Sequence, residues 1–496
     1  MASDTPYFAK VLIANRGEIA CRIMETLRRL GIISVAVYHA SERRSRFVQM
    51  ADEAIEIFGD TPVSAYLDGA QIIQAAQTAE AQAIHPGYGF LSENSGFARH
   101  VITAGLAFIG PTPDAIDLMG DKIRSREFAR KHDVPIAPSV QAGYDLDHFV
   151  AAACEIGFPL LIKASAGGGG KGMSIVRNRE TLASLAKTAM NEAQRYFANS
   201  AIYAERYIER PRHIEVQVFG DGAGNAIHLY ERECSIQRRF QKIVEEAPAA
   251  NLPEGLRQEI CAAAVRLTKA AKYLNAGTVE FILAPDNTFY FLEMNTRLQV
   301  EHPVTEMVTG LDLVELQIKI AAGQPISIPQ EAIVVNGSAI ECRICAEVPE
   351  RDFMPATGRL LKINIPTGEA IRFENGLLEG QDVTLNFDSM LAKLVVHGHD
   401  RTAATAAMQQ ALSKTVLLGV ETNINYLARI IAHPAFAKAR LHTDFIVEHK
   451  KSLDEPDHDA ATTAKVLLAA ALTFREFRRL AFEAPDPYAA MGAWRN

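Results

Sequence analysis

The chain has 496 residues, 48% of them hydrophobic and 22% charged, so it can form roughly three globular domains with large cores. A net charge of −8, without a dominant basic stripe, argues against nucleic acid as a partner. The longest late apolar run, residues 466–474, is far too short to cross a membrane, so no membrane is expected as a partner. The first ten residues show no signal pattern, which predicts a cytoplasmic protein, or a mitochondrial matrix protein whose transit peptide was removed.

The first elements predict a parallel-sheet α/β domain. Lys10–Ala14 reads as a short apolar strand, and Ile19, Ile23 and Leu27 have the spacing of one helix face. A second strand is expected at Ile32–Tyr38, and strands alternate with helices up to about residue 115. The glycine fingerprint of dinucleotide-binding domains does not follow the first strand, so a nicotinamide cofactor is not expected.

A glycine run between two predicted strands marks the next region. The strand at 159–162 leads into Lys163 and then Gly167–Lys171, and a second strand follows at 174–176. Consecutive glycines let backbone amides approach phosphate oxygens closely, and the two lysines add positive charge. Gly172 stands where a Walker loop has Ser or Thr, so this is not a Walker loop. A plain flexible loop remains the alternative for this segment alone.

Two segments further on combine a core face with charged groups. In residues 213–218, apolar side chains alternate with His213, Glu215 and Gln217, which predicts a strand with one polar face. The run 231–246 is rich in Arg, Lys and Glu and includes Lys242, which suits an anionic ligand. A solvated charge run is the alternative.

A hairpin is predicted for 278–283 and 288–294, and it sets Glu280 beside Glu293 and Asn295. Two carboxylates that share a site are electrostatically costly unless a cation lies between them. Carboxylate and amide oxygens are also the ligands that Mg²⁺ prefers. The hairpin therefore predicts a divalent metal site.

The polar pattern continues past the hairpin. Asn295, Arg297, Gln299 and Glu301 are spaced two residues apart, which in an extended chain places them on one face with Glu293. Beside the predicted metal ligands, this face then carries an arginine that can bind an oxyanion and a carboxylate that can take a proton. A solvent-facing polar edge strand is the alternative.

The third region opens on a strand in which Ile340, Cys342 and Ile344 alternate with Glu341 and Arg343. This alternation points the two sulfurs of the Cys-x-x-Cys sequence to opposite faces, and no second Cys-x-x-Cys completes a zinc site. A helix with an apolar stripe is expected at 402–413, a linker at 450–459, and an Ala/Leu-rich helix from 461.

Together these residues resemble the biotin carboxylase component of biotin-dependent carboxylases, in the ATP-grasp superfamily. The resemblance covers residues 8 to about 448 and rests on six motifs in order: Ile13–Ala20, His85–Asn94, Met119–Lys122, the glycine run, Cys234–Pro248 and Glu293–Glu306. It implies a fold that is both α/β and α+β. The implied domains are a parallel-sheet α/β domain (1–118), an ATP-grasp domain (119–330) with a mobile glycine-rich lid (about 136–208), a mixed β/α domain (331–448) and a linker with a helical start (449–496).

The resemblance also implies site residues by position. The ATP-binding positions correspond to Lys122, Lys163, Gly167, Gly168, Gly169, Gly170, Glu205, Arg206, Tyr207, Ile208, His213 and Gln237. The implied ligands of Mg²⁺ or Mn²⁺ are Glu280, Glu293 and Asn295. The substrate site corresponds to Lys242, Arg297, Gln299, Val300 and Arg343. The implied catalytic residues are Lys242, Arg297, Glu301 as general base, and Arg343, which stabilises the biotin enolate.

The implied activity is the ATP- and bicarbonate-dependent carboxylation of biotin on a carrier, through carboxyphosphate, as the first half-reaction of an acyl-CoA carboxylase. The expected partners are a biotin carrier domain or protein, a carboxyltransferase subunit and a second copy in a homodimer. The chain contains no Met-Lys-Met attachment motif, so we expect a fragment of a longer α-subunit or a chain served by a separate carrier. The acyl-CoA acceptor stays open.

Two positions depart from the family pattern. Phe240 stands where many members have a histidine that contacts nucleotide phosphate, and Ala166 replaces the first glycine of the loop. Altered ATP affinity is expected rather than lost activity. Two alternatives remain: another ATP-grasp ligase that forms an acylphosphate, and a catalytically silent subunit that only binds nucleotide and partners.

Overall fold

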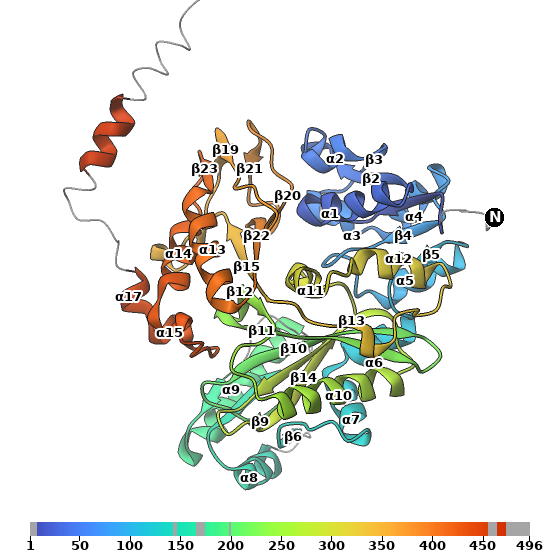
Figure 1. Cartoon of the computed structure of the whole chain (residues 1–496). Coiled ribbons are helices and arrows are strands. Elements are labelled where there is room, and N and C mark those ends of the chain that lie inside the picture. Colours follow the sequence, from blue (N-terminus) through green and yellow to red (C-terminus); the bar gives the residue numbers. More distant parts are fainter. Residues whose placement is uncertain (1–6, 142–145, 165–173, 198–199, 455–463, 473–496) are drawn as a thin grey trace, which may run out of the picture. The chain divides into compact units, whose positions relative to one another are not determined.

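The computed structural model describes residues 7–141, 146–164, 174–197, 200–454 and 464–472 (Figure 1). Ala166, the four predicted loop glycines and Lys171 lie outside the described residues. The chain divides into two compact units, Met1–Glu448 and His449–Asn496. The second unit contains α17 (Lys450–Asp454) and a helix at 464–472. Among the described residues, no helix is long and apolar enough to cross a membrane.

The first unit begins with a five-stranded parallel sheet in the order β3-β2-β1-β4-β5. Its strands are β1 (Lys10–Ile13), β2 (Ile33–His39), β3 (Glu53–Ile57), β4 (Ala83–His85) and β5 (Ala107–Phe108). The helices between them are α1 (Gly17–Arg29), α2 (Arg46–Met50), α3 (Pro62–Leu67), α4 (Gly69–Thr78) and α5 (Ser95–Thr103), with the 3₁₀ turn η1 (Ala40–Glu42). This arrangement confirms the predicted parallel-sheet α/β region.

A small antiparallel sheet follows, in the order β6-β9-β7-β8. It contains β6 (Ser139–Gln141), β7 (Leu160–Ala164), β8 (Ser174–Val176) and β9 (Ile202–Arg206), with α8 (Leu146–Ile156) and α9 (Arg179–Phe197) packed against it. Phe149, Leu160, Leu182 and Ile202 are among its fully buried core residues. Strands β7 and β8 flank the predicted glycine loop, as the sequence indicates.

The largest sheet is antiparallel and has eight strands in the order β14-β13-β10-β11-β12-β15-β22-β20. The strands are β10 (Arg212–Asp221), β11 (Ala226–Arg238), β12 (Gln241–Ala247), β13 (Leu274–Leu283), β14 (Phe289–Asn295), β15 (Ser338–Cys345), β20 (Ile371–Asn375) and β22 (Met390–Gly398). Because β12 pairs with β15, one sheet runs through both the second and the third predicted region. The domain boundaries proposed from the sequence stay predictions.

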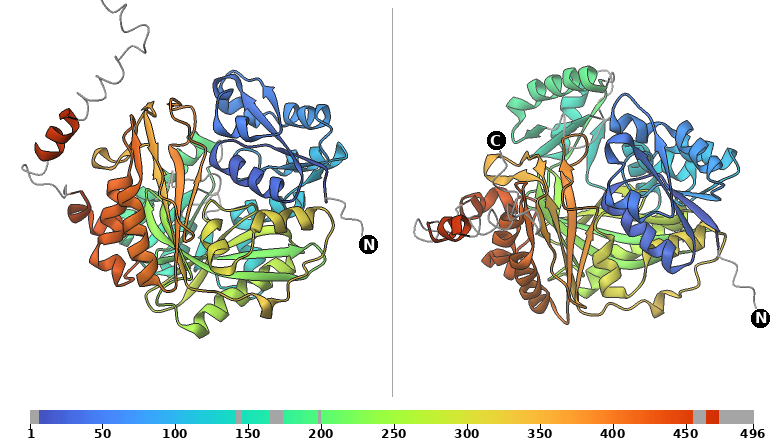
Figure 2. Two further views of the ribbon diagram at one scale, coloured as in Figure 1. Left: turned by 45° about the horizontal axis from the view of Figure 1, so that its top comes forward. Right: turned by 90° about the horizontal axis from the view of Figure 1, so that it is seen from above.

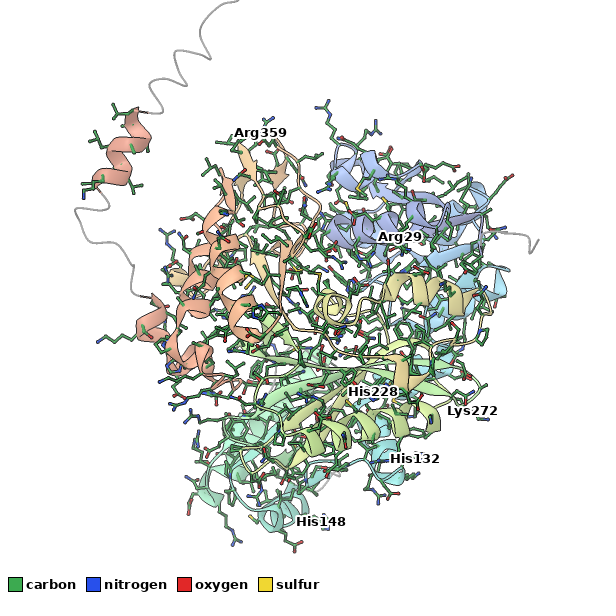
Figure 3. All side chains as sticks on the ribbon, viewed as in Figure 1. Arg29, His132, His148, His228, Lys272 and Arg359 are labelled. Atoms are coloured by element: carbon green, nitrogen blue, oxygen red, sulfur yellow. The ribbon has the colours of Figure 1, made fainter. Side chains whose placement is uncertain are left out.

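Helices cover this sheet and connect it to the rest of the unit (Figure 2). They are α6 (Pro113–Gly120), α7 (Lys122–Lys131), α10 (Glu254–Ala270), α11 (His302–Thr309), α12 (Leu313–Ala321), α13 (Arg401–Lys414), α14 (Ile424–Ala432), α15 (Pro434–Ala437) and α16 (Phe445–Glu448). Short elements complete the unit: η2 (Gln330–Ala332), β16 (Glu347–Val348), η3 (Pro349–Arg351), β17 (Met354–Pro355), β18 (Gly358–Arg359), β19 (Lys362–Asn364), β21 (Asp382–Val383) and β23 (Val416–Leu418). The described side chains fill the space between the sheets (Figure 3).

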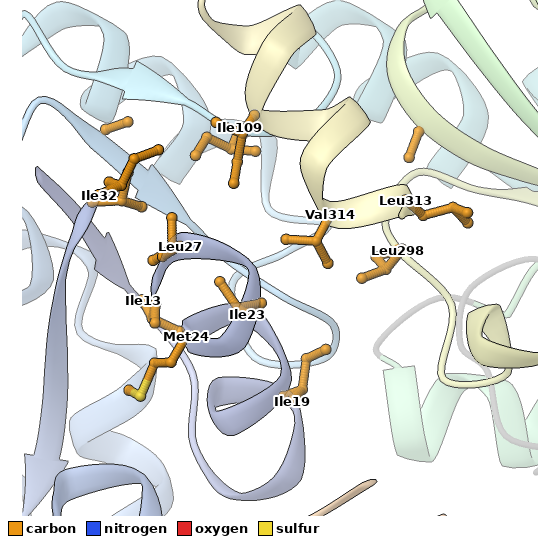
Figure 4. Close-up of a cluster of buried hydrophobic side chains, with 14 of the residues drawn as sticks. Ile13, Ile19, Ile23, Met24, Leu27, Ile32, Ile109, Leu298, Leu313 and Val314 are labelled. Atoms are coloured by element: carbon orange, nitrogen blue, oxygen red, sulfur yellow. The ribbon is translucent and has the colours of Figure 1, made fainter. Parts of the chain in front are cut away.

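One hydrophobic core joins the parallel sheet to the segment that follows β14. Ile19, Ile23 and Leu27 on α1 lie in the same cluster as Leu298 and Leu313 (Figure 4). Leu298 is fully buried there, so the loop between β14 and α11 is anchored against the first helix of the chain. The core thereby fixes the polar residues on either side of Leu298.

Candidate functional site

A cavity of about 710 Å³ lies where the small sheet, the large sheet and the β14–α11 loop meet. It contains every described residue that the sequence assigned to the site except Lys122. Those lining it are Lys163, Glu205, Arg206, Tyr207, Ile208, His213, Gln237, Lys242, Glu280, Glu293, Asn295, Arg297, Gln299, Val300, Glu301 and Arg343. Lys122 begins α7 and lies close enough to Glu293 to lower that carboxyl's pKa, against the larger effect of burial.

Lys242 on β12 lies at the centre of the cavity. Its Nζ donates to Glu280 Oε1 at 2.7 Å and to Glu301 Oε1 at 2.8 Å, and it also contacts Glu215. Burial acts to raise the pKa of Glu301, but Lys242 and Arg343 lower it well below its ordinary value. Glu301 is therefore held in its ionised form, as a group that accepts a proton must be.

Arg343 on β15 approaches the same carboxylate from the opposite side. Its Nη2 donates to Glu301 Oε2 at 2.8 Å, and its Nε donates to Glu245 Oε1 at 2.6 Å. Glu245 is fully buried, and burial raises its pKa to about 7 in spite of the adjacent guanidinium. Arg343 thus presents one edge to Glu301 while Glu245 fixes the other.

The β14–α11 loop supplies the remaining polar groups. The sequence predicts a strand at 288–294, and in an extended chain it places the polar residues from Glu293 to Glu301 on one face. The strand is confirmed as β14, but the extended conformation is wrong beyond Asn295, since the chain bends at Arg297 and α11 begins at His302. The polar side chains nevertheless converge: Arg297 donates to Gln299 Oε1 at 2.7 Å and to Asn295 Oδ1 at 3.1 Å.

The predicted metal ligands lie together on the hairpin of β13 and β14. Glu280 is directly opposite Glu293, and Asn295 Nδ2 donates to Glu280 Oε1 at 2.7 Å. Burial and repulsion by Glu280 raise the pKa of Glu293, which shows that the paired carboxylates disfavour each other. This oxygen-rich set fits Mg²⁺ or Mn²⁺. His213, Glu215 and Glu280 form a second group whose ligand atoms lie within 4.8 Å of one another.

Strands β7, β9 and β10 supply further residues that line the cavity. Lys163 pairs with Glu205, which also accepts from Arg126 Nη1 at 2.9 Å. Gln237 Nε2 lies 3.2 Å from His213 Nδ1. Arg206 Nη2 donates to the Ile156 carbonyl at 2.7 Å. Its guanidinium therefore binds the backbone at the end of α8 and not the polar groups around Lys242. Lys163 and His213, two of the expected nucleotide contacts, both line the cavity, and His213 Nε2 lies 3.0 Å from Glu280 Oε2.

Phe240 lies at the tip of the turn between β11 and β12 and lines the cavity. It is 69% exposed, and both it and Arg239 have positive φ angles, of 65° and 49°. Positive φ is unusual for a bulky residue and common for small or polar ones such as Asn. The aromatic ring thus stands at the cavity entrance, and its effect on nucleotide affinity stays a prediction.

Sequence reasoning missed several residues that contact the site. Glu93 accepts from Arg297 Nε at 3.1 Å, Glu245 holds Arg343, and Lys393 donates to the Val300 carbonyl at 2.9 Å. Glu93 and Glu245 stand inside motifs of the sequence, but a motif does not reveal which charge pairs with which. Nothing in the sequence around Lys393 indicates a contact with a residue 93 positions away.

Three family models match consecutive parts of the chain. The N-terminal domain of biotin carboxylase matches residues 7–116, the ATP binding domain of the carbamoyl-phosphate synthase L chain matches 121–328, and the C-terminal domain of biotin carboxylase matches 341–448. Together they contain all the described cavity residues assigned from the sequence.

Curated relatives agree with these matches. The chain is 46% identical over 445 residues to the biotin carboxylase of Nostoc sp., covering 90% of this chain and 100% of that protein. It is 46% identical over 491 residues to the mitochondrial methylcrotonoyl-CoA carboxylase subunit alpha of Dictyostelium discoideum, covering 98% of this chain and 70% of that protein. Across several such subunits the chain spans 62% to 70% of their length.

Solved structures show the same fold. The biotin carboxylase domain dimer of Hydrogenobacter thermophilus 2-oxoglutarate carboxylase, bound to MgADP, ADP and bicarbonate, has a TM-score of 0.87 at 45% identity, covering 91% of this chain and 99% of that one. A biotin carboxylase nucleotide complex from Campylobacter jejuni has a TM-score of 0.86 at 41% identity, covering 89% and 99%. On these grounds, the chain belongs to the biotin carboxylase family of ATP-dependent ligases.

Proposed function

We propose that this chain carboxylates biotin held on a carrier, using ATP and bicarbonate, as the first half-reaction of a biotin-dependent acyl-CoA carboxylase. The observation that carries this proposal is the buried Glu301 carboxylate, held between Lys242 and Arg343 at 2.8 Å from each. A carboxylate flanked by two cations beside an anion-binding arginine suits proton transfer from a bound oxyanion.

In the first step, a bicarbonate oxygen attacks the γ-phosphate of ATP, ADP leaves and carboxyphosphate forms, while Glu301 takes the proton of bicarbonate. Lys242 and Arg297 hold the anion in line with the phosphate. In the free site, two cations keep Glu301 ionised. Bound bicarbonate shares the positive charge of these cations and adds a negative charge beside Glu301. Both effects raise the proton affinity of Glu301 towards that of bicarbonate.

ATP binding uses a further set of groups. Lys163, Lys122 and His213 bind the phosphates, and residues 205–208 bind the adenine through their backbone. His213 also lies 3.0 Å from Glu280, so the nucleotide and metal sites adjoin. Lys163 is paired with Glu205, so its positive charge is already in place when a phosphate binds. The predicted glycine lid would exclude water and so protect the intermediate from hydrolysis.

Glu280, Glu293 and Asn295 would hold the divalent ion, and their opposed carboxylates fit one well. When bound, Mg²⁺ or Mn²⁺ neutralises charge on the transferring phosphoryl group. Lys242 already contacts Glu280, so the same lysine links the metal side of the cavity to the bicarbonate side.

In the second step, carboxyphosphate breaks down to CO₂ and phosphate, and the phosphate removes the N1 proton of biotin. N1 then attacks CO₂, while Arg343 offsets the negative charge that develops on the ureido oxygen. Gln299 and Val300 line the space beside Arg343 and complete the pocket for the planar substrates.

The partners follow from the same function. A biotin carrier domain must bring biotin to the cavity, and a carboxyltransferase subunit must pass the carboxyl group to an acyl-CoA that it selects itself. A homodimer is supported by the dimer named for the Hydrogenobacter domain. The working compartment is the cytoplasm or, as for the relatives named mitochondrial, the mitochondrial matrix.

ADP release with Mg²⁺-ATP and bicarbonate, with and without free biotin, tests the function. Biotin should stimulate turnover, and Glu301→Gln should lower that turnover by about 100-fold or more because the base is lost. Glu350→Gln is the control and should leave turnover unchanged, because the Glu350 carboxylate is half exposed, pairs with Arg429 and lies outside the cavity.

The other outcomes separate the alternatives. ATP cleavage that is indifferent to biotin would favour another ATP-grasp ligase. Nucleotide binding without any turnover would favour a catalytically silent subunit.

A further inference from the structure

A fully buried lysine lies behind the loop that carries Gln299 and Glu301. Lys393, on β22, donates from Nζ to the Val300 carbonyl at 2.9 Å and lies 3.3 Å from Glu18 Oε2. Lysine is almost never fully buried unless it is paired, so this placement requires specific partners. Val300 is the residue between Gln299 and Glu301, and holding its carbonyl fixes the backbone between them.

The same ammonium connects three distant parts of the chain. Glu18 lies on α1, beside the parallel sheet, and also accepts from the Tyr88 hydroxyl. Val300 belongs to the β14–α11 loop, and Lys393 belongs to the large sheet. One side chain therefore ties the loop to both neighbouring layers.

Lys393 is also a cross-strand neighbour of Arg343. The two residues are directly opposite each other where β15 pairs with β22. Like charges in this relation repel, which favours the orientation in which Arg343 reaches Glu245 at 2.6 Å and Glu301 at 2.8 Å. The lysine thus influences two walls of the anion site without lining the cavity.

We propose that Lys393 is a positioning residue for the bicarbonate and biotin site, acting through the Val300 carbonyl and through Arg343. The inference rests on the proposed function, because it concerns the geometry of that reaction. It goes further in assigning a role to a residue that touches neither nucleotide nor substrate.

Lys393→Met in the full chain tests this role, because Met fills a similar volume and removes the donor. The KM for bicarbonate should rise about 10- to 100-fold, because Arg343 and the backbone at Val300 are no longer held in place. The KM for ATP should stay unchanged. Lys393→Arg, which keeps a charged donor, should recover part of the loss. A loss of stability alone would not separate the two KM values in this way.

Arg401→Met is the matched control. Arg401, the first residue of α13, donates to Glu246 at 2.6 Å. Glu246 follows Glu245 on β12, and neither Arg401 nor Glu246 lines the cavity. The substitution therefore removes a largely buried ion pair away from the cavity. It should lower the urea midpoint of unfolding and leave the ratio of the two KM values unchanged.

The outcomes are distinct. Equal changes in both KM values, or a Lys393→Met variant that behaves like Arg401→Met, would overturn the positioning role. A wild-type chain without biotin-stimulated turnover would instead contradict the proposed function. If Lys393→Met does not fold, Glu18→Gln decides: its amide oxygen still accepts from Lys393, so a smaller but still bicarbonate-selective rise is expected, and no selective rise overturns the inference.

Discussion

Two carboxyl groups flank Arg343, and their surroundings give them different pKa values. Glu301 contacts two cations, Lys242 and Arg343, which lower its pKa against the effect of burial. Glu245 contacts Arg343 alone and is repelled by Glu301, so burial prevails and raises its pKa to about 7. Such a divergence fits the proposed roles of the two carboxyl groups, in which Glu301 accepts a proton and Glu245 positions Arg343.

The raised pKa of Glu245 predicts a pH dependence of stability. Between its ordinary value of 4.5 and about 7, the folded protein keeps a proton that the unfolded chain has lost. The contribution is therefore fully present below pH 4.5 and is lost as the pH rises through about 7.

Glu245→Gln should remove this dependence. Relative to the wild type, the free energy of unfolding of the variant should gain up to about 3 kcal/mol between pH 5 and pH 8. Urea unfolding at both pH values measures the difference, with Glu350→Gln as the exposed control. A constant offset between wild type and Glu245→Gln across this range would contradict the prediction.

At the scale of elements, α1 is connected to α11 and α12 by buried charges. Arg22 Nη2 donates to Glu306 Oε1 at 2.8 Å and to Asp312 Oδ1 at 3.0 Å. Arg29, near the end of the same helix, also contacts Asp312 at 2.8 Å, but its side chain is half exposed (Figure 3). The two arginines make similar contacts in different surroundings.

This contrast predicts unequal losses of stability. Arg22→Met should lower the free energy of unfolding by about 3 kcal/mol, because it removes a buried guanidinium from Glu306 and Asp312 and leaves them only their other partners. Arg29→Met should cost less than about 1 kcal/mol, since water screens an exposed pair. Urea unfolding of both variants compares them directly. Equal losses would show that burial does not decide the strength of these pairs.

Individual elements also differ in how far the sequence predicts them. The β8 strand and the Glu280–Glu293 pairing were predicted correctly, because alternation and a tight turn are local signals. The strand expected at 288–294 is confirmed as β14, but the extended conformation expected up to Glu301 ends at Asn295, beyond which Leu298 packs in the core with α1. In β10 both faces are buried, because Arg232 of β11 covers the polar face, where it donates to Glu215, Gln217 and Thr305 of α11.

At the scale of the whole chain, the described site residues all lie within Met1–Glu448, the first compact unit. A chain that ends at Glu448 should therefore keep biotin-stimulated ADP release and the KM values for ATP and bicarbonate. Steady-state kinetics of the two lengths, at matched concentrations, make the comparison. Loss of turnover at an unchanged urea midpoint would assign residues 449–496 a part in the reaction.

The sequence by itself determined the family of this protein and predicted its chemistry. Residue types and their spacing along the hairpin and the following loop predict oxygen ligands, an arginine and a carboxylate base, and the long motifs specify the family. These signals are local or linear, so they can be read without coordinates.

Only the tertiary structure decided how these groups are held. Glu93 meets Arg297, Glu245 meets Arg343, and Lys393 meets Val300 across sequence separations of 204, 98 and 93 residues. A pattern of neighbouring residues carries no information about such pairs, because the sheet order and the packing of α1 bring them together. The pKa values of Glu245 and Glu301 depend on the same contacts, so burial and charge in the folded chain set which carboxylate can act as the base.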